Sequence, residues 1–148
     1  MGARSNRFAV ALHALAVIAE RKGEPASSDW IAHSIGTNPV VIRRAMAPLR
    51  DAGLVASVAG ASGGFLLAKP AELIGLNQVW AAVEPAGSLA CHEGSEDCPV
   101  AAQLPPILAE IGQDMDRALD TSLRAWRLSD VTRRLCPEMK ALLAQKPL

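Results

Sequence analysis

The sequence predicts a mainly α-helical fold that contains one small β-hairpin. Half of the 148 residues are hydrophobic but only five are aromatic, so the core has to be built largely from Ala, Val, Leu and Ile. Apolar residues recur at spacings of three and four over most of the chain, which is the period of a helix. Two short apolar runs on either side of a glycine-rich segment depart from this period and indicate a pair of strands.

Two helices are expected at the start of the chain. Apolar residues spaced by three and four predict a first helix from about Asn6 to Lys22, which Gly23 ends. A short helix from Ser28 to about Ile35 follows, because serines that can cap it precede it and Gly36 comes directly after it.

A third helix follows after a short turn. Asn38 is a favourable N-cap, Pro39 fits the first helical position, and Gly53 suits the left-handed residue that ends a helix. Pro48 removes one backbone donor, so we expect the helix to bend late in its course.

The predicted hairpin comes next along the chain. Its strands are the apolar runs Leu54–Val58 and Phe65–Ala68, and its tip is the glycine-rich segment Gly60–Gly64. A helix, a short helix, a turn, a helix and a hairpin, in that order, form a winged helix-turn-helix.

The second half of the chain is predicted to hold one short and one long helix. The short helix covers residues 76–84, and irregular chain follows over residues 85–106 up to two consecutive prolines. A long helix is then expected from Ile107 to about Leu128, with Ser129 capping a last short helical piece. Its apolar seam is of the kind that packs against another helix, and we expect the dimer contacts to be Leu108, Ile111, Met115, Leu119 and Trp126.

These elements divide the chain into three regions. Residues 1–84 form the winged helix-turn-helix, residues 85–106 a cysteine-bearing linker loop, and residues 107–148 a dimerisation helix with a C-terminal tail. Residues 1–70 hold eight Lys and Arg against four acidic residues, a net charge of +4, whereas residues 71–148 carry a net charge of −4. This asymmetry, in a chain whose formal net charge is zero, favours a polyanion as partner of the N-terminal half.

Composition also argues against some classes of protein. Apolar runs in the sequence fall short of the length needed to span a bilayer, and the start of the chain lacks the unbroken apolar stretch of a signal peptide. Three cysteines are an odd number, unlike the paired framework of a secreted disulfide-rich protein. We therefore expect a cytoplasmic protein with no membrane partner.

The third helix is predicted to read DNA. Its apolar positions face the core, which leaves Val40, Arg43 and Arg44 outward or flanking. An arginine near the start of such a helix can fork onto a guanine or hold a phosphate, and a valine can pack on a thymine methyl group. Thr37 and Asn38 suit phosphate contacts, while glycines and a serine at the hairpin tip suit close approach to a groove. The candidate residues for binding double-stranded DNA are Thr37, Asn38, Val40, Arg43, Arg44, Ser62, Gly63 and Gly64.

These residues and their order resemble the Rrf2-type winged helix-turn-helix regulators. The matching stretches, spread over residues 5–135, are Arg7–His13, Thr37–Arg44, Leu49–Val55, Ala61–Leu67, Cys98–Val100 and Leu128–Val131. The resemblance implies a homodimeric transcription regulator joined through the long helix, with two recognition helices and two wings facing a palindromic operator. Many family members carry an arginine just before the first wing glycine, where this chain has Ala59. Arg43 and Arg44 are therefore expected to carry more of the affinity, and repression is the expected outcome of binding.

The cysteines distinguish this chain within the family. Members that bind an iron–sulfur cluster place three cysteines close together before the long helix, whereas this loop has Cys91 and Cys98, and Cys136 lies far along the chain. The chain thus resembles the branch that lacks the full cluster-binding set. Since such clusters usually take four ligands, mostly thiolates, we expect no cofactor and assign no metal ligand. An iron–sulfur-sensing regulator with atypical ligands stays open as an alternative.

Cys98 and Cys91 are candidates for a response to thiol oxidation. The apolar segment after Cys98 is expected to place its sulfur at a helix N-terminus, which favours the thiolate, although Glu96 and Asp97 oppose this. Cys91 is seven residues away and can act as the resolving partner. Two inert cysteines in a linker are the other open interpretation.

A thiol-based redox enzyme that uses Cys98, with His92 as its base, is the alternative from another class of function. The loop lacks a recognisable catalytic signature, and an enzyme would leave the DNA-reading half unexplained. We therefore do not expect an enzyme.

Overall fold

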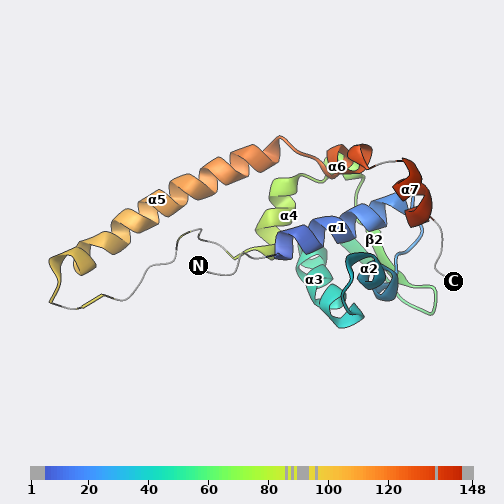
Figure 1. Cartoon of the computed structure of the whole chain (residues 1–148), viewed down its shortest axis with the longest axis horizontal. Helices are drawn as coiled ribbons and strands as arrows, with labels where there is room; N and C mark the ends of the chain where they lie inside the picture. The colour runs from blue at the N-terminus through green and yellow to red at the C-terminus, as the bar shows by residue number, and fades with distance from the viewer. Residues whose placement is uncertain are drawn as a thin grey trace.

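The computed structural model describes residues 6–85, 87, 89, 94, 95, 97–135 and 137–144. The predicted class, mainly α-helical with one β-hairpin, is confirmed. Figure 1 shows a body with α1 at its centre and one long helix, α5, that projects from it. The elements in chain order are α1 (Arg7–Glu20), α2 (Ser28–Ile35), α3 (Pro39–Asp51), β1 (Val55–Val58), β2 (Gly64–Leu67), the 3-10 helix η1 (Ala71–Leu73), α4 (Leu76–Val83), α5 (Pro99–Arg124), α6 (Leu128–Arg134) and α7 (Pro137–Ala144).

Local capping residues set the bounds of α2 and α3. The Ser27 hydroxyl accepts a hydrogen bond from the Trp30 backbone N–H, which fixes the start of α2. Gly36 ends that helix in the left-handed conformation, with a φ of 76°, and Gly53 takes a φ of 70° just after α3. α3 continues past Pro48 to Asp51. The sequence-predicted ends of both helices are therefore confirmed to within two residues.

The core surrounds α1. Ala11, Ala14, Leu15 and Val17 of this helix are fully buried, and α1 contacts α2, α3, α4 and α6. Each buried leucine or isoleucine in such a core contributes about 1.5–3 kcal/mol. The largest fully buried side chains from the other elements are Ile31, Ile42, Met46, Leu49, Leu54, Ile74, Val79 and Leu128.

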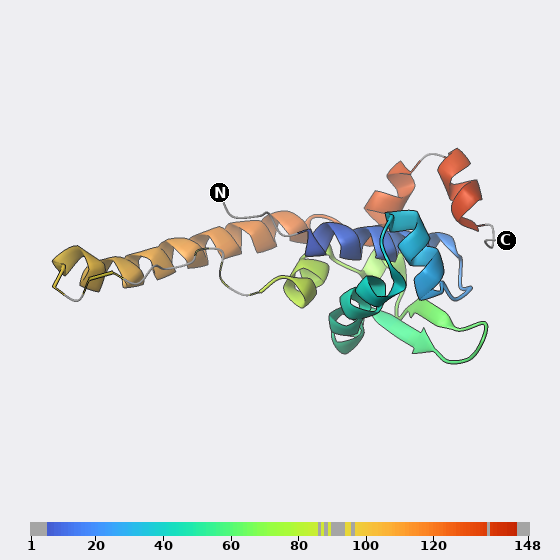
Figure 2. The same ribbon diagram turned by 60° about the horizontal axis from the view of Figure 1, so that its bottom comes forward.

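The hairpin is anchored to the chain just before α2. β1 and β2 pair antiparallel, and the backbone of Phe65 also exchanges two hydrogen bonds with Ala26, at 2.8 and 3.0 Å. A Cβ atom on Gly64 would lie 2.3 Å from the Ala26 carbonyl oxygen, so a side chain at this position requires the backbone to shift. In Figures 1 and 2 the hairpin and α3 lie on the same side of the body, opposite α6 and α7.

The long helix begins eight residues earlier than the sequence predicted. We expected Pro105 and Pro106 to end the linker at residue 106, but α5 starts at Pro99 and continues through both. The two prolines remove two backbone donors, so the carbonyls of Ala101 and Ala102 lose their usual helical partners, and Ala102 is exposed. Pro99 occupies the first turn, where the missing N–H costs nothing.

The long helix also ends earlier than predicted. α5 stops at Arg124, not near Leu128, because the backbone on either side of Arg127 pairs with the segment before α4. Leu76 N donates to the Trp126 carbonyl at 3.0 Å, and Leu128 N donates to the Ile74 carbonyl at 2.9 Å. These hydrogen bonds join the base of α5 to the body.

The chain after α5 returns to the body. α6 starts at Leu128, and the Asp130 carboxylate, not the predicted Ser129 hydroxyl, caps it by accepting from the Arg127 N–H at 2.7 Å. Leu128 is fully buried in the same core as α1. α7, which the sequence did not predict, follows at Pro137. The three-region division of the chain stays a prediction, but its C-terminal region contributes to the core of the N-terminal one.

Candidate DNA-binding surface

The predicted recognition helix, α3, has one face in the core and one in solvent. Ile42, Met46 and Leu49 are at most 1% exposed. Val40 keeps 47% of its surface exposed and Val41 keeps 39%, so two adjacent large apolar side chains of this helix face solvent. The exposed residues along this helix and its N-cap include Asn38, Val40, Val41, Arg43 and Arg44.

The start of α3 is closed by its own cap. The Asn38 Oδ1 atom accepts from the Val40 N–H at 3.0 Å and from the Val41 N–H at 3.1 Å. Two of the amides that a helix N-terminus offers to a phosphate are therefore occupied. The Asn38 side-chain NH₂ group remains available as a donor at this end, beside the half-buried Thr37.

The two arginines of α3 differ in their surroundings. Arg43 Nη1 donates to the Ser28 Oγ atom at 3.0 Å, which connects α3 to the first turn of α2. Among the described residues, the exposed Arg44 guanidinium has no hydrogen-bond or ion-pair partner. Arg43 thus has a side-chain partner within the chain, whereas Arg44 has none among the described residues.

The residues of the predicted wing tip serve two purposes. Ser62 is exposed at the tip, as a phosphate contact requires. Gly63 and Gly64 are packed against backbone: a Cβ on Gly63 would lie 2.1 Å from the Val58 carbonyl oxygen, and Gly64 abuts Ala26. Both glycines are therefore needed to shape the hairpin, and a DNA contact by either stays a prediction.

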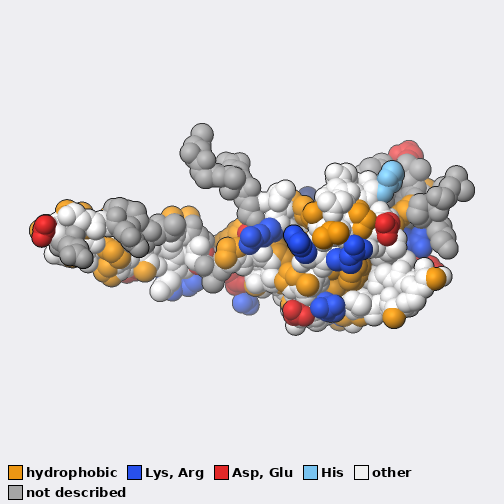
Figure 3. Space-filling model, turned by 90° about the horizontal axis from the view of Figure 1, so that it is seen from below, with side chains coloured by type: hydrophobic (Ala, Val, Ile, Leu, Met, Phe, Trp, Pro, Cys, Tyr) orange, Lys and Arg blue, Asp and Glu red, His pale blue; other side chains and the backbone are white. Residues whose placement is uncertain are grey.

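Figure 3 looks onto the side of the body that carries α3. Lys and Arg side chains are distributed over this side among apolar ones, and acidic side chains are sparse on it. Positive charge interleaved with apolar groups fits a duplex, which offers phosphates beside thymine methyl groups.

The projecting helix exposes apolar side chains. Of the predicted dimer contacts, Ile111 is 46% and Met115 47% exposed, while Leu108 and Leu119 are half-buried. Val100 and Ile107, which the sequence analysis did not single out, are 65% and 51% exposed. Gly112 is the one residue of α5 that is buried in the described part of the chain.

Trp126 does not belong to this apolar row. It lies beyond the end of α5, half-buried against the core of the body, with the Arg134 guanidinium 4.4 Å above its ring. The expectation that it continues the seam of the long helix was wrong in this respect, because the chain becomes extended at that point.

Asp120 connects the base of α5 to α4. Its carboxylate accepts from Arg124 Nε at 2.6 Å and from Asn77 Nδ2 at 3.2 Å. The hydrogen bond from Arg124, with that from Asn77, lowers the pKa of Asp120 below its ordinary value. The ionised form is therefore the one that holds α4 and α5 together.

Cys98 occupies the N-cap of α5 and is half-buried, so the predicted placement of its sulfur at the start of a helix is confirmed. Its carbonyl accepts the first helical hydrogen bond, from Ala102 N at 3.2 Å. Cys91, His92 and Cys136 lie outside the described residues. Within the described part of the chain, His, Cys, Asp and Glu side chains form no group of three that could hold a metal ion.

Comparison with known proteins adds a family to this geometry. The model of the Rrf2 family, described as an iron-dependent transcriptional regulator, matches residues 4–134. YwnA of Bacillus subtilis (strain 168), named as an HTH-type transcriptional regulator, is 38% identical over 133 residues, which cover 88% of this chain and 98% of YwnA.

Solved structures share the fold. CymR, the global cysteine regulator of B. subtilis, has a TM-score of 0.66 and 23% identity, covering 92% of this chain and 100% of that chain. The oxidized form of CymR from Staphylococcus aureus has a TM-score of 0.63 and 25% identity, covering 91% and 99%. Among the described residues, no helix is both long and apolar enough to cross a membrane.

Proposed function

This chain belongs to the Rrf2 family of transcriptional regulators, and on that premise we propose that it is a dimeric, sequence-specific repressor acting in the cytoplasm. Membership in a family of transcriptional regulators favours this function over the thiol enzyme considered above. The observation that carries the proposal is the exposed face of α3, where Val40, Val41, Arg43 and Arg44 are turned away from the core.

Arginine and valine suit base reading in a major groove. A guanidinium can donate two hydrogen bonds to one guanine, and an exposed valine can contact a thymine methyl group. The hairpin lies on the same side of the body as α3 (Figures 1 and 2). We infer that α3 enters the major groove and that the tip around Ser62 follows the flanking backbone.

The exposed apolar row on α5 supports a homodimer. Ile107, Ile111 and Met115 recur at four-residue spacing on a helix of 26 residues that projects from the body. A second copy that packs the same row against this one buries both rows at once. Two-fold symmetry then presents two α3 helices to the DNA, which fits a palindromic operator.

Repression follows from occupancy. A dimer that covers two successive major grooves excludes other proteins from the same stretch of duplex, and this needs only the DNA-binding surface and the dimer contacts. An operator that overlaps a promoter is then silenced by binding alone.

Selection from fragmented genomic DNA tests this function. The full-length chain is mixed with the fragments at physiological salt, and bound fragments are sequenced. We expect an inverted repeat whose half-site centres lie about 34–36 Å apart, or a multiple of this, along the helix axis. Enrichment of no sequence would overturn sequence-specific binding, and enrichment of an isolated half-site would overturn the dimer. Arg44→Ala should weaken the enrichment, whereas Arg117→Ala, which removes an arginine from the exposed surface of α5, is the matched control and should not.

The sulfur donors do not fit a cluster held by one chain. The sequence contains three cysteines, whereas an iron–sulfur cluster usually takes four ligands that are mostly thiolates. The described one, Cys98, is half-buried at the start of α5. We therefore propose a regulator that acts without a cluster, although the family model describes iron-dependent members.

We propose a thiol response in its place. Cys98 stands where α5 begins, so a new bond at its sulfur bears on the helix that carries the dimer contacts. In the proposed reaction the Cys98 and Cys91 thiols lose two electrons and two protons to an oxidant and form one S–S bond; with diamide, the azo group becomes the hydrazine. A solved structure of S. aureus CymR is of its oxidized form. This supports an oxidation response in a protein of this fold.

Variants at the two cysteines test this response. Diamide should reduce DNA binding by the wild type, and a reductant should restore it. Cys98→Ser should stay bound throughout, and Cys91→Ser distinguishes a Cys91–Cys98 disulfide from another adduct, which non-reducing mass spectrometry identifies. An equal response of wild type and Cys98→Ser would show that Cys98 is not the responding thiol and would overturn the proposed Cys91–Cys98 disulfide.

A further inference from the structure

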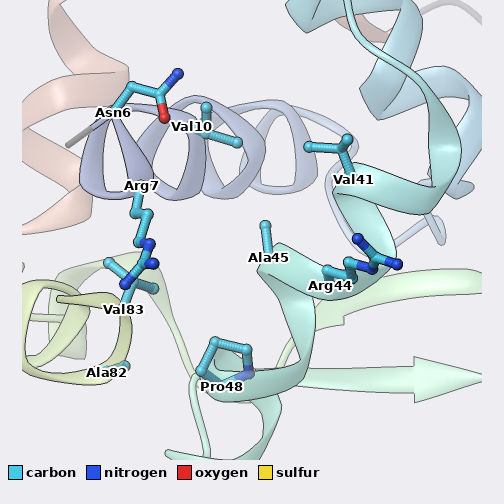
Figure 4. Close-up of a pocket in the computed structure, with 9 residues that line it drawn as sticks. All are labelled: Asn6, Arg7, Val10, Val41, Arg44, Ala45, Pro48, Ala82 and Val83. Carbon is cyan, nitrogen blue, oxygen red and sulfur yellow. The ribbon is translucent and has the colours of Figure 1, made fainter. Parts of the chain in front are cut away.

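A cavity of about 450 Å³ lies beside the recognition helix. Its walls come from the start of α1, from one side of α3 between Val41 and Pro48, and from the end of α4 (Figure 4). Figure 4 places Arg7 beside Val83 on one side and Arg44 with Val41 on the other, with Val10, Ala45 and Pro48 around the space between them. The volume is within the range of small-molecule sites, about 300–1,000 Å³.

The lining combines an apolar interior with donors of one sign. Six of its residues have hydrocarbon side chains: Val10, Val41, Ala45, Pro48, Ala82 and Val83. The polar lining residues are Asn6, Arg7 and Arg44, and no lining residue is acidic. An apolar wall with a few polar groups at its edge is typical of a ligand site. Arg44 lies at the rim with its guanidinium turned outward in Figure 4, and rotation of this exposed side chain would let it pair with a carboxylate in a two-pronged geometry.

Resting on the DNA-binding function proposed above, we propose that this cavity binds a small organic carboxylate with an apolar body and that its occupancy releases DNA. The carboxylate pairs with Arg44 at the rim, and the apolar body lies against Val10, Ala45 and Val83. A bare phosphate fits less well, because it has no apolar part to cover these walls.

The sign of charge separates this cavity from a second one of comparable size. A cavity of about 410 Å³ between α4 and α5 has Glu84, Asp116 and Asp120 among its lining residues, so its charge disfavours an anion. Adjacent alanines of α4 line these two cavities: Ala82 lines the first cavity and Ala81 lines the second. This pair provides a substitution and its matched control on one helix.

Competition between the carboxylate and DNA follows from shared residues. Val41 and Arg44 belong both to the exposed face of α3 and to the cavity wall. A carboxylate that engages Arg44 removes that guanidinium from the duplex, and its bulk beside Val41 obstructs the approach of a base pair. Binding of one therefore weakens binding of the other by the same factor.

Direct titration without DNA tests the site independently of the DNA-binding function. The full-length wild type is titrated calorimetrically with hexanoate and phenylacetate, and with hexanamide and phenylacetamide as neutral matches. We expect the carboxylates to bind at one site per chain and the amides to bind at least about tenfold more weakly. Ala82→Leu should abolish carboxylate binding by filling the cavity, whereas Ala81→Leu should bind as the wild type does.

The same variants are then titrated on operator DNA by fluorescence anisotropy. The carboxylates should displace DNA from wild type and Ala81→Leu, while Ala82→Leu should bind DNA within about twofold of wild type and ignore them. If Ala82→Leu fails to fold by circular dichroism, Arg44→Gln provides a second test in the titration without DNA and should weaken the carboxylates but not the amides.

Three results would overturn the proposal: no saturable carboxylate binding, equal binding of acids and amides, or unchanged binding by every cavity variant. Carboxylate binding without any DNA binding would retain the site and reject the proposed function. DNA binding that no carboxylate affects, despite saturable binding, would reject the coupling.

Discussion

Arg43 is tied to the start of α2, because its Nη1 atom donates to the Ser28 Oγ atom at 3.0 Å. Its neighbour Arg44 has no such partner among the described residues and lies on the wall of a cavity. A side chain already held in one orientation loses little freedom on binding, which favours directional contacts to a base. A side chain that can rearrange suits a phosphate.

We expect Arg43→Ala to cost about 1–3 kcal/mol on the operator and to relax specificity at one base pair. Arg44→Ala should weaken operator and scrambled DNA alike and lower the salt slope by about one. Both are measured by titration at several salt concentrations. Arg50→Ala, in the last turn of α3, is the control. Unchanged binding by both variants would mean that α3 is not the recognition helix.

Replacing Ile111 and Met115 with Asp should give monomers that bind operator weakly. Two charges in the middle of the apolar row of α5 have to be desolvated in a paired arrangement, which is unfavourable without counter-charges. Light scattering gives the mass. Gln113→Asp, on the opposite side of the same turn, should remain dimeric. A double variant with the dimer mass would reject this interface.

Leu128→Ala should lower the free energy of unfolding by about 2–5 kcal/mol, since the side chain is fully buried in the core around α1. Leu73→Ala is a matched control, because Leu73 is 61% exposed, and should change it by no more than about 0.5 kcal/mol. Urea denaturation measures both. If Leu128→Ala lowered the free energy of unfolding as little as Leu73→Ala does, the C-terminal segment would not stabilise the body.

Asp120→Asn should lower the melting temperature at neutral pH and lose this effect in acid. The pKa of Asp120 is lower in the folded chain, mainly through the hydrogen bond from Arg124, so its ionised form stabilises the fold above its unfolded pKa. That contribution is lost as the pH falls through the folded pKa. As the pH is lowered from 7 to below the ordinary aspartate pKa of about 3.9, the melting temperatures of the two proteins should approach each other. Glu110→Gln, at an exposed position of α5, controls for loss of one charge. A difference that does not shrink in acid would contradict the expectation.

Local signals made the first half of the fold predictable. Ser27, Asn38 and two glycines cap their helices through atoms within a few residues, so the sequence contains the whole interaction. The exposed face of α3 followed from its helical period in the same way.

Contacts between distant segments accounted for the errors. The end of α5 depends on hydrogen bonds from Leu76 and Leu128 to partners about 50 residues away in the chain, and no local pattern indicates them. The contact of Arg43 with Ser28 and the exposure of Val41 likewise depend on how α2 packs on α3. The prolines near the start of α5 misled the prediction because an interior proline usually ends a helix.

Leu128 also sets the order in which a newly made chain can fold. Synthesis releases α1 to α4 first, but the core around α1 lacks one of its fully buried leucines until the segment after α5 has left the ribosome. A chain interrupted within α5 therefore carries α3 and the hairpin on an unfinished body, which unfolds more readily. Completion of the proposed DNA-reading half thus waits for the segment that follows the proposed dimer helix, and we expect prematurely ended products to be poor competitors for the operator.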